Sequence, residues 1–139
     1  MKAVIVYWTG SGNTQIMADS IQEAIEDMDL ECEYYQVSET SAEDVKDADI
    51  FFLGSPAMND ENVEEYEFRP FQDELNPHLS GKKVVMFGSY DWGEAEWMEN
   101  WKQEMNDVGA QIMDTFVVQW EPNDDQLKEI YGKTQEIMK

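Results

Sequence analysis

The chain has 139 residues, a formal net charge of -22 from 31 acidic and 9 basic side chains, and one cysteine. The length suits one domain over residues 1–139, and the charge argues against nucleic acid or an anionic membrane as partner, because like charges repel. Such a surface would attract a basic protein partner, although the acidity could also serve solvation alone.

Short apolar runs alternate with longer amphipathic segments along the chain. The apolar runs are typical of buried strands, and the spacing of three and four residues between apolar positions in the other segments is typical of helices. In chain order we expect a strand at 3–8, a helix at 17–28, a strand at 32–37, a helix at 40–48, a strand at 50–53, a helix at 71–79, a strand at 83–89, a helix at 97–108, a strand at 111–120 and a helix at 127–137.

Local signals support several of these boundaries. Thr40 with Glu43 forms a capping-box signature, Gly54 ends the third strand, and Pro70 and Pro77 bracket the third helix. Cys32 lies in the second strand and cannot form an internal disulfide, so we interpret it as a small buried hydrophobic residue rather than a nucleophile.

The remaining features concern location and metals. No stretch reaches the roughly 20 apolar residues of a membrane span, and the N-terminus enters a strand without a signal-peptide pattern. We therefore expect a cytoplasmic protein that does not bind membranes. His78 is the only histidine and the acidic run after Met58 does not have EF-hand spacing, so no metal site is expected.

Five strands alternating with helices predict a doubly wound α/β fold, in which a parallel sheet is covered by helices on both faces. In such folds ligands bind beyond the carboxyl ends of the strands, where the strand order reverses. The loops after the first, third, fourth and fifth strands are therefore the candidate binding loops.

The first of these loops is TGSGNT. It lacks the spacing of a dinucleotide fingerprint and the lysine of a P-loop, but it offers hydroxyls, glycines and free amides at a helix start. It therefore reads either as a phosphate cradle or as an ordinary glycine-rich turn. Its residues are Thr9, Gly10, Ser11, Gly12, Asn13 and Thr14.

The other loops carry aromatic and acidic side chains. Trp92 is large enough to need cover, and with Met58 it could clamp a planar ring, although Trp92 could instead fold onto its own domain and Met58 could be core filler. The second loop contains Ser55, Pro56, Ala57, Met58, Asn59, Asp60 and Glu61, the third Ser89, Tyr90, Asp91, Trp92, Gly93 and Glu94, and the fourth Gln119, Trp120, Glu121 and Pro122.

Together these loops resemble those of the flavodoxins, in particular the short-chain clostridial type. The resemblance rests on YWTGSGNT, GSPAMNDE, GSYDWGEAEWM and the EP pair, in the expected order along the whole chain. It implies the three-layer, five-stranded parallel sheet of flavodoxin-like proteins, with strand order 2-1-3-4-5 and FMN at the switch point.

The resemblance also implies a role for each loop. Residues 9–14 would wrap the FMN phosphate, Met58 would contact the inner face of the ring and Trp92 its outer face. Ser55, Ala57 and Trp97 would border the ribityl chain and the ring, Ser89, Tyr90, Asp91 and Gly93 would supply backbone groups to the pyrimidine edge, and Glu121 would accept the flavin N3 hydrogen.

By the same resemblance the protein is a low-potential one-electron carrier, not an enzyme, in which non-covalently bound FMN cycles between semiquinone and hydroquinone. Its partners would be redox proteins with basic docking patches, and it would act as a monomer. The negative charge near the ring should disfavour the anionic hydroquinone. That charge comes from Asp60, Glu61, Glu64, Glu65, Glu67, Asp91 and Glu94.

Two positions depart from the family pattern, which has glycine at both. Asn59 would have to adopt a positive φ when the peptide flips on reduction, so we expect a less stabilised semiquinone. Asp91 would add a carboxylate at the pyrimidine edge or point into solvent.

Two other functions fit the same architecture. An FMN-dependent NAD(P)H:quinone or flavin reductase would need space above the ring, which Trp92 would cover. A flavin-free, receiver-like signalling domain would need an aspartate at the end of the third strand, where this chain has FFLG.

Overall fold

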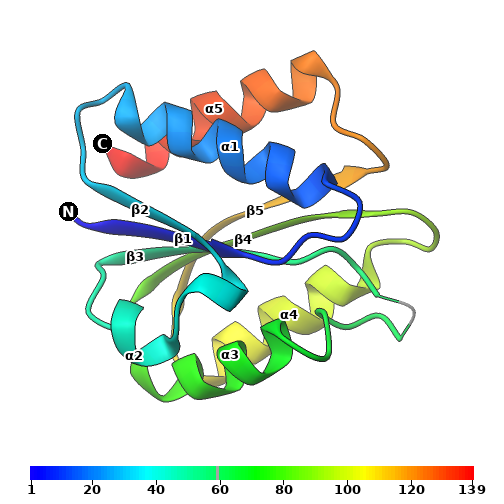
Figure 1. Cartoon of the computed structure of the whole chain (residues 1–139), viewed down its shortest axis with the longest axis horizontal. Helices are drawn as coiled ribbons and strands as arrows, with labels where there is room; N and C mark the ends of the chain where they lie inside the picture. Colours follow the sequence, from blue (N-terminus) through cyan, green and yellow to red (C-terminus); the bar gives the residue numbers. More distant parts are fainter. Residues whose placement is uncertain (59) are drawn as a thin grey trace.

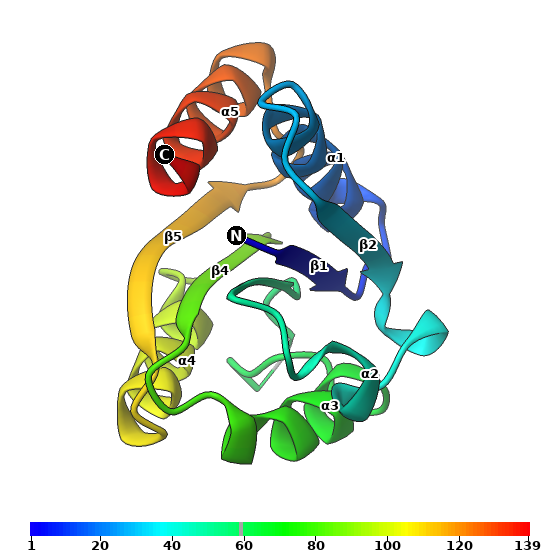
Figure 2. The same cartoon turned by 90° about the vertical axis from the view of Figure 1, so that its left-hand side faces the viewer.

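The computed structural model describes every residue of the chain except Asn59. Its centre is a parallel sheet of five strands in the order β2-β1-β3-β4-β5. Helices α1 and α5 cover one face, and α2, α3 and α4 cover the other (Figure 1, Figure 2). The predicted three-layer fold and strand order are therefore confirmed.

The elements have the following bounds. The strands are β1 (Ala3–Tyr7), β2 (Cys32–Gln36), β3 (Ile50–Gly54), β4 (Lys83–Tyr90) and β5 (Gln111–Gln119). The helices are α1 (Asn13–Glu26), α2 (Ala42–Val45), α3 (Phe68–Leu75), α4 (Glu96–Asp107) and α5 (Asp124–Met138), with short 3-10 turns at η1 (Val37–Glu39) and η2 (Asn76–His78). No helix in the described part of the chain is long and apolar enough to cross a membrane.

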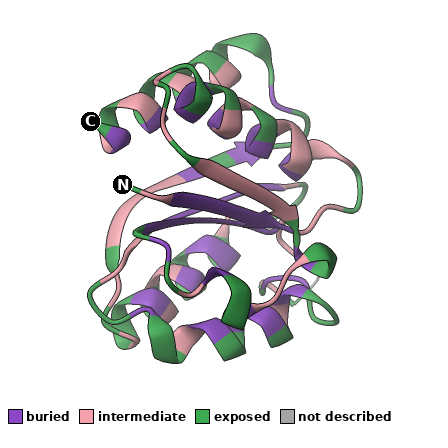
Figure 3. Ribbon diagram, turned by 60° about the vertical axis from the view of Figure 1, so that its left-hand side comes forward, coloured by how far each residue is buried: buried purple, intermediate pink, exposed green. Residues whose placement is uncertain are grey.

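The core lies on both faces of the sheet, and the strands β1 and β3 are buried at every position (Figure 3). Along β1, Val4 and Val6 face the α3 and α4 side, whereas Ile5 and Tyr7 face the α1 and α5 side. Because helices cover both faces of a parallel sheet, successive positions of a central strand are mostly apolar. The continuous apolar runs in the sequence have this cause.

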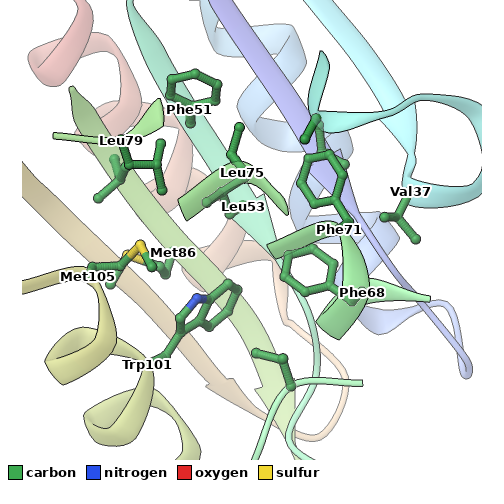
Figure 4. Close-up of a cluster of buried hydrophobic side chains, with 14 of the residues drawn as sticks. Val37, Phe51, Leu53, Phe68, Phe71, Leu75, Leu79, Met86, Trp101 and Met105 are labelled. Atoms are coloured by element: carbon green, nitrogen blue, oxygen red, sulfur yellow. The ribbon is translucent and has the colours of Figure 1, made fainter. Parts of the chain in front are cut away.

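The larger cluster joins α3 and α4 to the sheet (Figure 4). Phe68 of α3 meets Trp101 of α4 edge to face, with ring centroids 5.5 Å apart. The indole N–H of Trp101 donates to the buried amide oxygen of Gln72 at 3.1 Å. This internal hydrogen bond allows a polar group to remain in the core.

Cys32 lies at the start of β2, where it is half-buried and packs against the core. Burial raises the pKa of its thiol to about 12, and the carboxylates of Glu26 and Glu33 act in the same direction. The thiol is therefore neutral at ordinary pH. This agrees with its interpretation as a hydrophobic residue rather than a nucleophile.

Most helices begin or end a few residues from the predicted positions: α1 begins at Asn13 rather than 17, and α5 at Asp124 rather than 127. The second helix is capped by the Ser41 hydroxyl, which accepts from Asp44 N, and the capping box lies instead at Gln36 and Glu39. Helix α3 starts at Phe68, three residues before the predicted start, with Pro70 in its first turn. Proline is tolerated there because first-turn amides have no partner within the helix.

The start of α3 is held by Glu64, a buried residue at 3% exposure. Its carboxylate accepts hydrogen bonds from the amides of Tyr66, Glu67 and Phe68 at 2.5 to 3.0 Å. Its own amide donates to the Ser55 hydroxyl at 3.0 Å. Glu64 therefore caps the start of α3, and unlike its neighbour Glu65 it is buried. Its predicted contribution to the negative field around the ring stays a prediction.

Replacing Glu64 by Gln should lower the free energy of unfolding by about 1 to 3 kcal/mol, because the charged acceptor of three amides at the start of α3 is lost. Urea unfolding followed by circular dichroism measures this. Glu65→Gln is the matched control, since Glu65 is exposed, and it should change stability by less than about 0.5 kcal/mol. Equal stability of the two variants would contradict the capping role.

Candidate functional site

Four loops meet at the carboxyl edge of the sheet, on the right in Figure 1. They follow β1, β3, β4 and β5, and β1 lies beside β3 in the sheet although β2 comes between them in the chain. The chain therefore leaves β1 in one direction and β3 in the other. Such a reversal opens a crevice outside the strand ends, where ligands of doubly wound folds bind.

The first loop leads directly into α1. Gly12 is the N-cap of this helix and has φ of 98°, a backbone conformation that favours glycine, and it supplies no capping side chain. The hydroxyl of Thr9 accepts from Gly12 N at 3.0 Å. The first-turn amides of α1 thus point out of the helix without a partner from within it.

Thr14 lies in that first turn and is 1% exposed. Among the described residues its hydroxyl oxygen is one of the few buried side-chain polar atoms without a hydrogen-bond partner. A buried hydroxyl that lacks a partner is costly, whereas an anion at the helix N-terminus would accept from it and from the amides. The loop therefore fits a phosphate group, although it contains no lysine.

Trp8 connects this loop to the residue that precedes α3. Its indole N–H donates to the Glu67 carboxylate at 3.1 Å. A Cβ on Gly10 would lie 3.1 Å from the Trp8 ring, so the glycine lets the loop lie close to the indole. The first strand ends at Tyr7, one residue before its predicted end, and the local sequence pattern does not indicate the contact of Trp8 with Glu67.

The second loop continues alongside β4 after β3 has ended. Ser55 N donates to Phe87 O at 3.1 Å, and Ala57 N donates to Ser89 O at 3.0 Å. Gly88 allows this approach, because a Cβ there would lie 2.1 Å from Ser55 O. The second loop is thereby fixed to the strand that leads into the third loop.

Met58 and Trp92 line a common cavity of about 200 Å³. Its other lining residues are Ala57, Glu61, Asp91 and Gly93. Trp92 is 79% exposed, so it is not folded into its own core. A polarizable thioether and an open indole around one cavity suit a flat aromatic ligand.

Glu61 joins the second and third loops. Its carboxylate accepts from Trp97 N at 3.0 Å, at the start of α4, and its carbonyl accepts from the Asn100 side chain at 3.1 Å. A carboxylate is favoured at this position by the helix dipole. Glu61 also has φ of 55°, so its backbone is held in a conformation that non-glycine residues seldom adopt.

Several predicted site residues lie outside this cavity. Trp97 is fully buried, and its indole N–H donates to Ser55 O at 3.2 Å, so it supports the second loop from below. Glu121 is exposed and is not part of the cavity lining. Ser55 and Ser89 are buried, Pro56 and Tyr90 are half-buried, Asp60 is exposed, and Asn59 lies outside the described residues.

Several exposed carboxylates lie in the segments that follow β3 and β4. Asp60 and Glu65 line a neighbouring cavity of about 270 Å³ together with Met58, Glu64 and Tyr66. The exposed members of the predicted acidic set are Asp60, Glu65, Glu67, Asp91 and Glu94. Glu64 and Glu61 differ from these because their carboxylates are bonded to helix amides.

The known proteins that this chain resembles include flavodoxins. Residues 5–133 match the family model described as Flavodoxin. The flavodoxin of Megasphaera elsdenii is 43% identical over 119 residues, covering 86% of this chain and 87% of the relative, and that of Clostridium beijerinckii is 41% identical, covering 86% and 88%. The solution structure of two-electron reduced M. elsdenii flavodoxin superimposes with a TM-score of 0.87 at 39% identity, over 96% of this chain and 98% of that one.

The close approach at Gly88 leads to a prediction. Gly88→Ala should lower the free energy of unfolding by about 2 to 4 kcal/mol, because the added methyl group collides with backbone rather than with a flexible side chain. Gly132→Ala is the control, since Gly132 lies in α5 with open space around it and should gain about 0.5 to 1 kcal/mol. Thermal unfolding of both variants measures the difference, and a tolerated Gly88→Ala would contradict the tight packing.

Proposed function

We propose that the four loops hold FMN at the carboxyl edge of the sheet. The chain belongs to the flavodoxin family and is an FMN-binding electron carrier, and ligands of doubly wound folds bind at this edge. The phosphate would bind in residues 9–14, and the ring would lie between Met58 and Trp92. The unpartnered hydroxyl of Thr14 under the start of α1 supports this placement most directly.

The phosphate end requires donors rather than a cationic side chain. Hydrogen bonds to a charged group contribute roughly 1.5 to 3 kcal/mol each, so four or more of them offset much of the cost of removing a phosphate from water. The hydroxyls of Thr9, Ser11 and Thr14 and the amides of the loop are the available donors. The N-terminus of α1 adds a favourable dipole, and no acidic residue lies in its first turn.

At the ring end, the chain supplies packing and backbone groups. Met58, Ala57 and Trp92 would exclude water from the ring, and residues 89–93 would offer amides and carbonyls to its polar edge. Bound FMN supplies one-electron chemistry, and the protein determines where it lies and which charges surround it. Two carboxylates could accept from the ring N3 position, the predicted Glu121 and the cavity-lining Glu61.

The surrounding acidity suits a low potential and a basic partner. Exposed carboxylates next to the cavity oppose the gain of negative charge on the ring, and they would attract a redox protein with a basic docking surface. The precise partner surface, a monomeric state and a cytoplasmic location are parts of this proposal. The predicted effect of Asn59 on reduction stays a prediction.

The alternative of an NAD(P)H-dependent reductase is not favoured. Two relatives that are more than 40% identical to this chain are named flavodoxins. An anaerobic reductive titration of the purified protein, followed by visible absorption, tests the proposal. We expect tightly bound FMN and two separate one-electron steps, whereas bleaching of the flavin band by NAD(P)H alone would support the reductase.

Thr14→Val should weaken FMN binding by about tenfold or more, because one charge-assisted hydrogen bond to the phosphate is lost while the shape is kept. The FMN-free protein should be as stable as the parent or more stable, since a buried hydroxyl without a partner is removed. Flavin fluorescence quenching measures the dissociation constant. Thr115→Val, on β5 away from the first loop, is the control and should bind FMN normally.

The reduction potential of the lower one-electron couple should rise as salt is added, because ions screen the negative field at distances beyond about 10 Å at 0.1 M ionic strength. Potentials measured at several NaCl concentrations check this. A potential that does not depend on salt would mean that distant carboxylates do not set it.

A further inference from the structure

Two exposed indoles lie side by side at the carboxyl edge, and the proposed function uses only one of them. Trp92 is 79% exposed and Trp120 is 45% exposed. Their rings meet edge to face, with centroids 5.0 Å apart and an interplanar angle of 87°. This is a favourable geometry for two aromatic rings.

The backbone around Trp120 is tied to the third loop. Trp120 N donates to Tyr90 O at 2.8 Å, and the Gln119 side chain donates to Asp91 O at 3.1 Å. These bonds join the end of β5 to the segment that carries Trp92. The ring contact is therefore the third link between the same two loops.

Trp120 also has a strained backbone, with φ of 61°. A bulky residue is disfavoured in this left-handed region, where glycine and asparagine are better tolerated. Strained residues of this kind persist where the surrounding structure determines them, and they gather at ligand sites. A tryptophan in this conformation lowers the stability of the fold, so we expect its side chain to contribute to ligand binding.

We propose that Trp120 is a positioning residue, which holds the indole of Trp92 beside the cavity that Trp92 shares with Met58 before FMN binds. This inference rests on the proposed function. A side chain as exposed as Trp92 would otherwise lose rotamer freedom when the ligand arrives, and ordering it in advance reduces that cost of binding. The benefit would appear as slower release of FMN.

The pair itself can be detected without FMN. Two indoles in contact give a far-ultraviolet exciton couplet in circular dichroism. We expect the couplet in the FMN-free protein and its loss in both Trp92→Phe and Trp120→Phe. A wild-type protein without a couplet would overturn the inference and leave the FMN site untouched.

The effect on binding is tested with Trp120→Asn, since asparagine suits the backbone. We expect FMN to bind about three- to tenfold more weakly, while the stability of the FMN-free protein does not fall. Trp120→Phe keeps a ring at the contact and should bind FMN within about twofold of the parent. Unchanged FMN binding by Trp120→Asn would overturn the inference.

A double-mutant cycle separates positioning from direct contact. If Trp120 acts through Trp92, then Trp120→Asn should change the FMN dissociation constant by less than about twofold in a Trp92→Ala background. An equal loss with and without Trp92 would mean that Trp120 acts independently and would overturn the inference. A parent protein that binds no FMN would contradict the proposed function instead.

Discussion

The site depends on the way in which the second loop stays hydrogen-bonded to β4 after β3 has ended. Ser55 and Ala57 donate to carbonyls of β4, and this pairing requires the bare backbone of Gly88. Because β4 itself continues into the third loop, the two loops that carry Met58 and Trp92 share one rigid support. The cavity between them follows from this backbone pairing rather than from attraction between the two side chains.

The positions of the acidic side chains explain how a chain of net charge -22 can leave a helix start open to an anion. Its acidic groups are divided by position. Glu61 and Glu64 are bonded to the amides at the starts of α4 and α3, where a negative charge is stabilised by the helix. The start of α1 has no acidic side chain in its first turn, so its amides remain available to a phosphate. The N-termini of α3 and α4 thus bind carboxylates of the chain itself, whereas the N-terminus of α1 is left open to a ligand.

Some of the site could be predicted from residue types and their order. The continuous apolar runs indicated central parallel strands, and the glycines and hydroxyls of residues 9–14 indicated a loop between a strand and a helix start. The roles of Glu64 and Trp97 could not be found in this way. Glu64 belongs to a run of acidic residues that resembles a solvated surface, and only the folded chain brings its carboxylate to three amides at and just before the start of α3.

The sequence by itself determined the architecture, the order of the loops and the family, because periodicity and short motifs are local properties of the chain. Only the tertiary structure decided which loop residues share a cavity, which carboxylates face inward and which glycine is sterically required. It also revealed the contact between Trp92 and Trp120, which are 28 positions apart and adjacent only because β4 and β5 pair in the sheet. Contacts of this kind depend on strand register, and strand register is a property of the whole fold.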